Sequence, residues 1–408
     1  MNFFTSEAKM QDWLSKLLAE AYGIADLISD SDSLKSFSPA SLAEQKILES
    51  YNTCLASLYI NEPISENENI SIDSRDILKP DFILYAPETE SVVIVELKNI
   101  AGPTRQAGTE LAAYSCEIQS SIPFISDGDI VNVIISTEWP TLLKHYVFHQ
   151  IFWQRKNVIC LEPFDEDGKI RLRIVDIKRL SQDNTSFKIS DKHIGGYQVC
   201  LYDDELYTDK ADRTRLDKFL EQMKAALHSM AVCGNSQNNH GFAFLWKDNW
   251  ELSLAPYSIT LLNFAPFQSI ERFLHIKDTK LPDMVKRFMD ISKENSAIGH
   301  GHSLSAINDY GSRFLKNICS PMAEAFTYWD DLRDIMLSRA ELIAFEAWGM
   351  FGEVFSDKLA SEYENGNCTY TSTSPELGLR TIEELIDKNY DFIDLAYMNC
   401  ADPDEDDS

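Results

Sequence analysis

The chain has 408 residues, and its 37 lysines and arginines against 65 aspartates and glutamates give a formal net charge of −28. The length corresponds to two or three domains, and 44% hydrophobic residues are enough for real cores, which excludes global disorder. The negative charge argues against nonspecific affinity for nucleic acid or an anionic membrane, but it leaves room for a local basic patch.

The first half of the chain alternates between helical and strand patterns. Apolar residues at a helical period predict a first helix over residues 5–21, and runs rich in β-branched residues predict strands further on. From Ser41 the predicted order is helix, strand, strand, helix, strand, helix, strand, at residues 41–60, 77–85, 91–97, 104–119, 131–136, 141–154 and 157–163. The polar residues 61–75 suit a loop or a short edge strand. This alternation predicts an α/β domain with a mixed sheet flanked by helices.

The pattern changes beyond about residue 195. Residues 213–230 form an amphipathic helical pattern, residues 241–264 suggest a hairpin, and from Leu281 onward helices are expected to dominate. The longest of them is expected to run from Ser320 toward Glu364. We therefore expect an α/β domain with N-terminal helices at 1–195, a mostly helical C-terminal domain with a short β-hairpin at 196–400, and an acidic tail at 401–408.

Three features indicate the compartment. The eight cysteines contain no CxxC pair, which argues against a zinc knuckle or a disulfide framework. The N-terminus lacks a basic region followed by an apolar stretch. No apolar run approaches the roughly 18 residues that cross a bilayer. We expect a reduced, cytoplasmic protein that has no membrane partner.

Charged residues interrupt the two apolar runs at 77–85 and 91–97. Asp81 begins the first strand, and Glu96 and Lys98 end the second. Because side chains alternate along a strand, Glu96 and Lys98 point to the same face. Two carboxylates on neighbouring strands are hard ligands suited to Mg²⁺, and a lysine beside them can position water or offset charge on a phosphate. The combination suits phosphodiester hydrolysis.

Pro80 with Asp81, followed by Glu96 and Lys98, resembles the motif of the PD-(D/E)xK nuclease superfamily. The resemblance covers residues 40–165 and implies a restriction-endonuclease-like fold. It further implies metal-dependent endonuclease activity, with Mg²⁺, or alternatively Mn²⁺, held by Asp81, Glu96 and the carbonyl of Leu97. Lys98 would be the catalytic lysine. The contrary interpretation is a surface ion pair between Glu96 and Lys98, but strands covered on both faces make unused charges costly.

The family often adds an acid from the preceding helix and a glutamine from the following one. Glu44 lies on the apolar stripe of the helix at 41–60, so we expect it to serve as a catalytic acid and metal ligand, with Glu49 as the second choice. Gln106 matches the glutamine position of RecB-like nucleases. In the resembling nucleases a tyrosine follows this glutamine by four residues. Here Glu110 occupies that position, and Tyr114 lies one turn later.

A basic island is the candidate for substrate binding. Lys169, Arg171 and Arg173 alternate along a predicted strand, and Lys178 and Arg179 follow. Phosphates would bind there if these cations face the substrate. The alternative is a strand face that charge keeps soluble.

Trp246 and Trp250 flank the predicted hairpin turn. They either stack on bases or fill a core.

Two functions follow. The first is a Mg²⁺-dependent nuclease acting on DNA, which resembles effectors of restriction or anti-phage defence. Its C-terminal domain would bind a protein partner or form a homodimer. The second is a nuclease-like subunit that does not cut and serves as a binding partner in a larger complex, because a −28 chain needs a basic partner to approach DNA.

Overall fold

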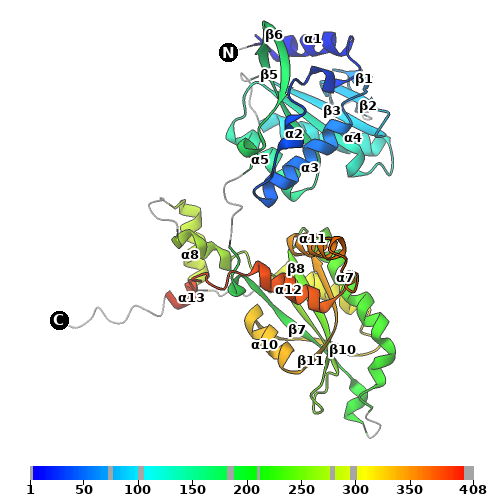
Figure 1. The fold of residues 1–408 in the computed structure, drawn as a ribbon, viewed down its shortest axis with the longest axis vertical. Helices are drawn as coiled ribbons and strands as arrows, with labels where there is room; N and C mark the ends of the chain where they lie inside the picture. Colours follow the sequence, from blue (N-terminus) through cyan, green and yellow to red (C-terminus); the bar gives the residue numbers. More distant parts are fainter. Residues whose placement is uncertain are drawn as a thin grey trace, which may run out of the picture. The chain divides into compact units, whose positions relative to one another are not determined.

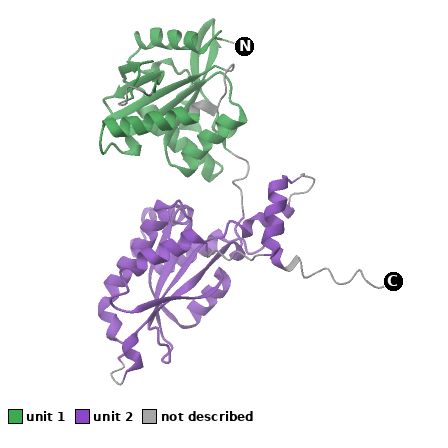
Figure 2. Cartoon of the chain, turned by 180° about the vertical axis from the view of Figure 1, so that it is seen from behind, with its two compact units in different colours: residues 1–187 green, residues 188–408 purple. Residues whose placement is uncertain are grey.

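The computed structural model describes residues 3–71, 77–99, 105–181, 188–208, 212–275, 281–294 and 301–398, without the side chains of 105–107 and 397–398. The chain forms two compact units, residues 1–187 and residues 188–408 (Figure 2). The predicted boundary after residue 195 would cut strand β7 (Ile194–Tyr202), which belongs wholly to the second unit. The predicted acidic tail at 401–408 lies outside the described residues.

Unit 1 alternates helices and strands much as predicted (Figure 1). Its helices are α1 (Glu7–Leu18), α2 (Ser33–Ser36), α3 (Leu42–Ala56), α4 (Arg105–Ser121), α5 (Thr141–Phe148) and α6 (Ile177–Leu180). Its strands are β1 (Glu62–Glu66), β2 (Phe82–Ala86), β3 (Ser91–Lys98), β4 (Ile130–Ser136), β5 (Asn157–Glu166) and β6 (Lys169–Ile174). A π-helical turn (His149–Trp153) extends α5, and short 3₁₀ turns occupy Ile24–Leu27 and Asp127–Asp129.

The six strands form one mixed sheet in the order β1-β2-β3-β4-β5-β6. β3, β4 and β5 are mutually parallel, and the remaining neighbours are antiparallel. β3 and β4 are apolar and almost fully buried, as parallel strands covered on both faces must be. The α/β class and the mixed sheet of the prediction are thereby confirmed.

Helices α1 and α4 each contribute a carboxylate to Lys98 at the end of β3. α1 and α4 both pack against β3, while α3 packs against β5. Gly108 allows α4 to approach α5, because a Cβ at this position would lie 2.7 Å from the ring of Tyr146. The start of α4 is thus held close to the end of β3, where the charged residues lie.

Unit 2 is built on a five-stranded antiparallel sheet rather than on helices alone. The strand order is β10-β7-β9-β8-β11, with β8 (Gly241–Asp248), β9 (Tyr257–Phe264), β10 (Ser320–Tyr328) and β11 (Ala340–Trp348). The helices are α7 (Leu220–Ser236), α8 (Asp283–Glu294), α9 (His302–Ser312), α10 (Trp329–Arg339), α11 (Met350–Glu364), α12 (Pro375–Leu385) and α13 (Leu395–Met398). Short 3₁₀ turns occupy Asp191–His193, Asp204–Tyr207, Arg215–Phe219 and Gln268–His275.

The prediction of a mostly helical second domain is therefore wrong in one respect. The expected hairpin is present as β8 and β9, but the expected long helix from Ser320 contains two strands, β10 and β11, with α10 between them. The alanines and glutamates of β11 have helical propensity. Pairing along β8 and burial of aromatic residues such as Phe345 outweigh that local preference.

Within the described residues, no helix combines the length and apolar character needed to cross a bilayer.

Candidate metal centre

The antiparallel pair β2–β3 brings the predicted motif together. Phe82 pairs with Val95, so Asp81, just before β2, lies beside the last residues of β3. The backbone N–H of Leu97 donates a hydrogen bond of 2.7 Å to Asp81 Oδ2 and fixes the orientation of that carboxylate. Leu97, predicted as a carbonyl ligand, thus contacts the motif through its amide.

Lys98 lies at the centre of a group of carboxylates. Its Nζ is 2.5 Å from Glu96 Oε1, 2.9 Å from Glu110 Oε2 and 3.5 Å from Glu7 Oε1. Glu96 and Lys98 share a face of β3 as predicted, while Glu110 reaches Lys98 from the second turn of α4. The end of β3 and the second turn of α4 therefore meet at Lys98.

Glu7 is the residue that the sequence did not reveal. It stands in the first turn of α1, whose N-terminus is capped by Ser6. Ligand oxygens of Glu7, Asp81 and Glu96 all lie within 4.8 Å of one another, a separation that one cation can bridge. An acid in the first turn is common in helices because it suits the helix dipole, so Glu7 carried no distinctive pattern.

Burial shapes the charge of these groups. Glu96 is only 3% exposed, and its Oε2 has no hydrogen-bond partner among the described residues. Burial, reinforced by the neighbouring Asp81, raises the pKa of Glu96 to about 9 despite the opposing Lys98. Burial also raises the pKa of Asp81 to about 6, against the effect of the Leu97 hydrogen bond. Among the described side chains, the positive charge around these buried carboxylates is not sufficient to offset their burial.

Lys98 alone does not balance this negative charge. Burial by itself lowers the pKa of Lys98, but the nearby Glu96 and Glu110 outweigh it and hold the pKa above its usual value. One ammonium group therefore faces four carboxylates, those of Glu7, Asp81, Glu96 and Glu110. The oxygen-only donor set and the unpartnered Glu96 oxygen fit a hard divalent cation such as Mg²⁺.

The structure does not bring Glu44 to this group. The Glu44 carboxylate accepts a 2.7 Å hydrogen bond from the N–H of Ala40, while the Glu44 N–H donates to the side chain of Ser41. This reciprocal arrangement caps α3, which explains a buried acid on an apolar stripe without catalysis. Glu49, the second choice, accepts from Gln45 on the exposed face of the same helix.

Helix α4 contains two residues named by the sequence, Gln106 and Tyr114. Gln106 lies in α4, but its side chain is not among the described ones. Tyr114 faces the start of β2, where its hydroxyl donates a 3.0 Å hydrogen bond to the carbonyl of Lys79. Tyr114 thereby supports the backbone next to Asp81.

The predicted substrate track is largely engaged within the protein. Arg173 and Arg179 both contact the buried carboxylate of Glu162, at 2.7 and 3.0 Å. Arg171 donates to the carbonyl of Asp26 and pairs with Glu166. Of these five cations, Lys169 and Lys178 are exposed and form no ion pair with the described residues, and two strands separate β6 from β3.

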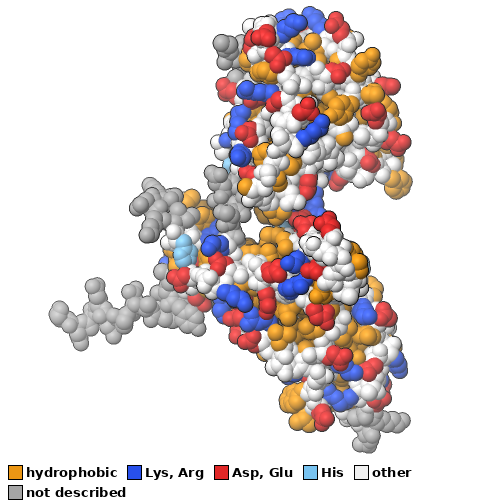
Figure 3. Space-filling model, viewed as in Figure 1, with side chains coloured by type: hydrophobic (Ala, Val, Ile, Leu, Met, Phe, Trp, Pro, Cys, Tyr) orange, Lys and Arg blue, Asp and Glu red, His pale blue; other side chains and the backbone are white. Residues whose placement is uncertain are grey.

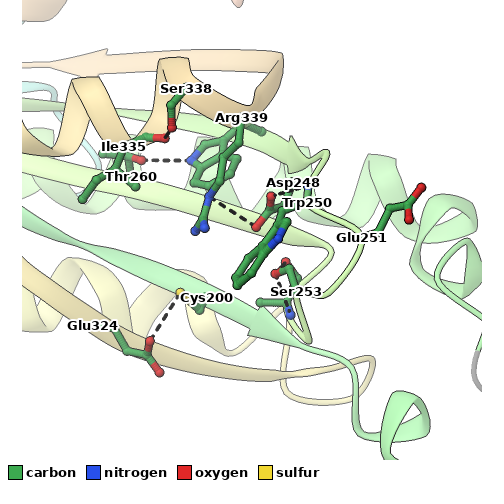
Figure 4. Close-up of polar contacts among 12 residues, drawn as sticks. Cys200, Asp248, Trp250, Glu251, Ser253, Thr260, Glu324, Ile335, Ser338 and Arg339 are labelled. Carbon is green, nitrogen blue, oxygen red and sulfur yellow. Dashed lines mark hydrogen bonds and ion pairs between the residues drawn. The ribbon is translucent and has the colours of Figure 1, made fainter.

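The two tryptophans of the hairpin have different roles. Trp246 is fully buried, and its Nε1 donates to Thr260 Oγ1 at 2.9 Å. Trp250 is half exposed beside Arg339, which pairs with the buried Asp248 (Figure 4). Trp246 is thus a core residue, and base stacking by Trp250 stays a prediction.

Comparison with known proteins gives no match: no family model, no curated protein and no solved structure is significantly similar to the chain. The resemblance to PD-(D/E)xK nucleases therefore stays a prediction that rests on Asp81, Glu96 and Lys98.

The raised pKa values predict an unusual pH dependence of stability. The pKa values of Asp81 and Glu96 lie above those of unfolded carboxyls, so the folded state binds more protons. The contribution of these two groups to the stability of unit 1 without metal should be lost progressively as the pH rises from about 4 to about 9. Thermal unfolding in EDTA measures this, and Glu96→Gln should flatten the decline. A wild-type curve and a Glu96→Gln curve that fall in parallel would contradict the assignment.

Glu7 and Glu44 provide a test residue and a control for metal binding, because Glu7 lies in the carboxylate group and Glu44 does not. Removing a carboxylate from the group should weaken Mn²⁺ or Mg²⁺ binding by about tenfold or more. Isothermal titration calorimetry should therefore show weaker binding for Glu7→Gln and unchanged binding for Glu44→Gln. Equal affinity of Glu7→Gln and the wild-type protein would remove Glu7 from the site.

Proposed function

We propose that unit 1 is a restriction-endonuclease-like nuclease that hydrolyses phosphodiester bonds in a metal-dependent reaction, with DNA as the expected substrate. One observation carries this proposal: Glu7, Asp81 and Glu96 converge beside Lys98 at the end of β3. By the resemblance stated above, the protein would act in restriction or anti-phage defence.

Each residue of the group has a distinct task in this proposal. Glu7, Asp81 and Glu96 would hold Mg²⁺, which when bound lowers the pKa of a water ligand and offsets charge on the phosphate. Lys98 keeps its proton, because its neighbours raise its pKa. It therefore stabilises negative charge in the transition state rather than accepting a proton from water. Glu110 positions Lys98 from α4.

The protein surface limits how a nucleic acid is bound. On the face shown in Figure 3, lysines and arginines are interspersed with aspartates and glutamates and do not form a continuous basic stripe. Arg173 and Arg179 are held by Glu162. Affinity for DNA should thus be weak without metal or a partner and should fall steeply with salt.

The engaged arginines also favour a second candidate function, that of a nuclease-like subunit that binds a partner and does not cut. In this role the acidic protein would join a complex whose other members contact nucleic acid. Both functions use the same fold. They differ in whether the group around Lys98 turns over a substrate.

The cleavage prediction separates the two candidates. Plasmid DNA incubated with the full chain should be cut in Mg²⁺ and left intact in EDTA. Asp81→Asn and Lys98→Met should each lower the rate by about 100-fold or more, because they remove a ligand or the compensating charge. Glu44→Gln is the control and should cut like the wild-type protein. Cleavage that survives both Asp81→Asn and Lys98→Met would exclude this mechanism, and absence of cleavage in the wild-type protein would favour the second candidate.

The basic track yields a separate prediction about stability. Arg179→Ala leaves part of the buried Glu162 carboxylate without its partner, so it should destabilise unit 1 by about 1–3 kcal/mol. Lys169→Ala removes an exposed cation of the same track and should change stability by less than about 0.5 kcal/mol. Urea unfolding measures both. If Arg179→Ala leaves the unfolding curve unchanged while weakening DNA binding, Arg179 is a substrate contact and the structural role is wrong.

A further inference from the structure

An apolar pocket of about 300 Å³ lies in unit 1, away from the carboxylate group. Strands β1, β2 and β3 form its floor, and the last turns of α4 form one wall. The apolar residues that line it are Ile64, Ile70, Ile83, Leu84, Tyr85, Val92, Ile118 and Ile122. Ile64 is 63% exposed and Ile122 is 48% exposed, so the pocket opens at the surface.

The pocket adjoins the edge of the sheet. β1 is the terminal strand, and within the described residues it pairs with β2 alone. Four of its five residues are exposed. An edge strand presents backbone N–H and C=O groups that an extended chain can pair with. In β1, Pro63 has no N–H to donate and the register shifts between Pro63 and Ser65, so pairing is confined to the other residues. Ile64 lines the apolar pocket directly beside that edge.

Charge selects the kind of chain that can bind. Among the described residues of this edge, Glu62, Glu66 and Glu68 lie in or just after β1, and Lys79 precedes β2, so acids outnumber bases. Glu62 and Glu66 stand at the two ends of β1, and Glu117 lines the pocket. Like charges repel an acidic strand, nucleic acid or an anionic membrane from this edge, whereas they attract a basic strand.

We propose that the edge of β1 and its pocket bind an extended basic segment of a partner protein. The segment adds as a further strand beside β1, places an apolar side chain against Ile64 in the pocket, and brings its lysines or arginines within reach of Glu62 on one face of the sheet or of Glu66, which also accepts from Ser15, on the other. A second copy of this chain fits poorly, because its basic stretch at 169–179 already forms β6 and the arginines Arg173 and Arg179 pair internally. The inference does not depend on whether unit 1 cuts DNA.

A defined peptide tests the proposal on the full chain. The probe is a fluorescent seven-residue peptide that alternates lysine with valine or isoleucine. One comparison peptide has glutamate for each lysine, and another has glycine for each apolar residue. Fluorescence anisotropy should show binding of the first peptide and at least about tenfold weaker binding of the other two. Hydrogen exchange should show new protection of the amides of 62–66 in the complex.

Two variants and a control identify the surface. Ile64→Ser should weaken binding by about tenfold, and Glu62→Lys should weaken it through charge. Leu252→Ser in unit 2 removes a side chain of similar size and exposure (77%) and should have no effect. Because Ile64 and Glu62 are exposed, both variants should keep the melting temperature of the wild-type protein.

Three results would overturn the proposal. They are equal binding of the glutamate peptide, unchanged affinity of both Ile64→Ser and Glu62→Lys, and absence of protection at 62–66. Sedimentation that shows a dimer of the free chain, lost in Ile64→Ser, would identify a second copy as the occupant instead.

Discussion

Crowding of negative charge around a single lysine is the constraint on which unit 1 depends. Lys98 is held at the end of β3 by carboxylates that come from β3 itself, α4 and α1. Without that ammonium group, the buried Glu96 would hold its proton more strongly, because a buried carboxyl with no compensating charge stays neutral. Even with it, the pKa of Glu96 is raised to about 9. The arrangement is electrostatically incomplete in a way that a divalent cation would correct.

Charge compensation also helps to explain the net charge of −28. A total of −28 combines acids at the proposed metal site, acids that pair with arginines, as Glu162 does, and acids at the edge of β1. These three groups are physically different. In the proposals above, the first would attract a metal ion and the third would select a basic partner, whereas the second stabilises the fold.

The candidate site was predictable where its residues are close in sequence. Asp81, Glu96 and Lys98 lie on two strands joined by a short turn, so the alternation of side chains was sufficient to place them together. Glu44 was chosen wrongly because a buried acid on an apolar stripe has two explanations, and its capping hydrogen bonds with Ala40 and Ser41 are visible only in three dimensions. Glu7 comes from a helix more than 70 residues before Asp81, and no periodic pattern links the two.

The sequence alone determined the α/β class of unit 1, the positions of most of its strands and the core of the charged motif, because these depend on local periodicity and on the pairing of adjacent strands. Tertiary structure decided the rest. It made strands of β10 and β11 by giving them the neighbours β7 and β8, and it paired the half-exposed Arg173 and Arg179 with the buried Glu162. It also carried Glu7 to the end of β3. Contacts between distant segments set each of these outcomes, since partner, burial and charge compensation are properties of the folded chain.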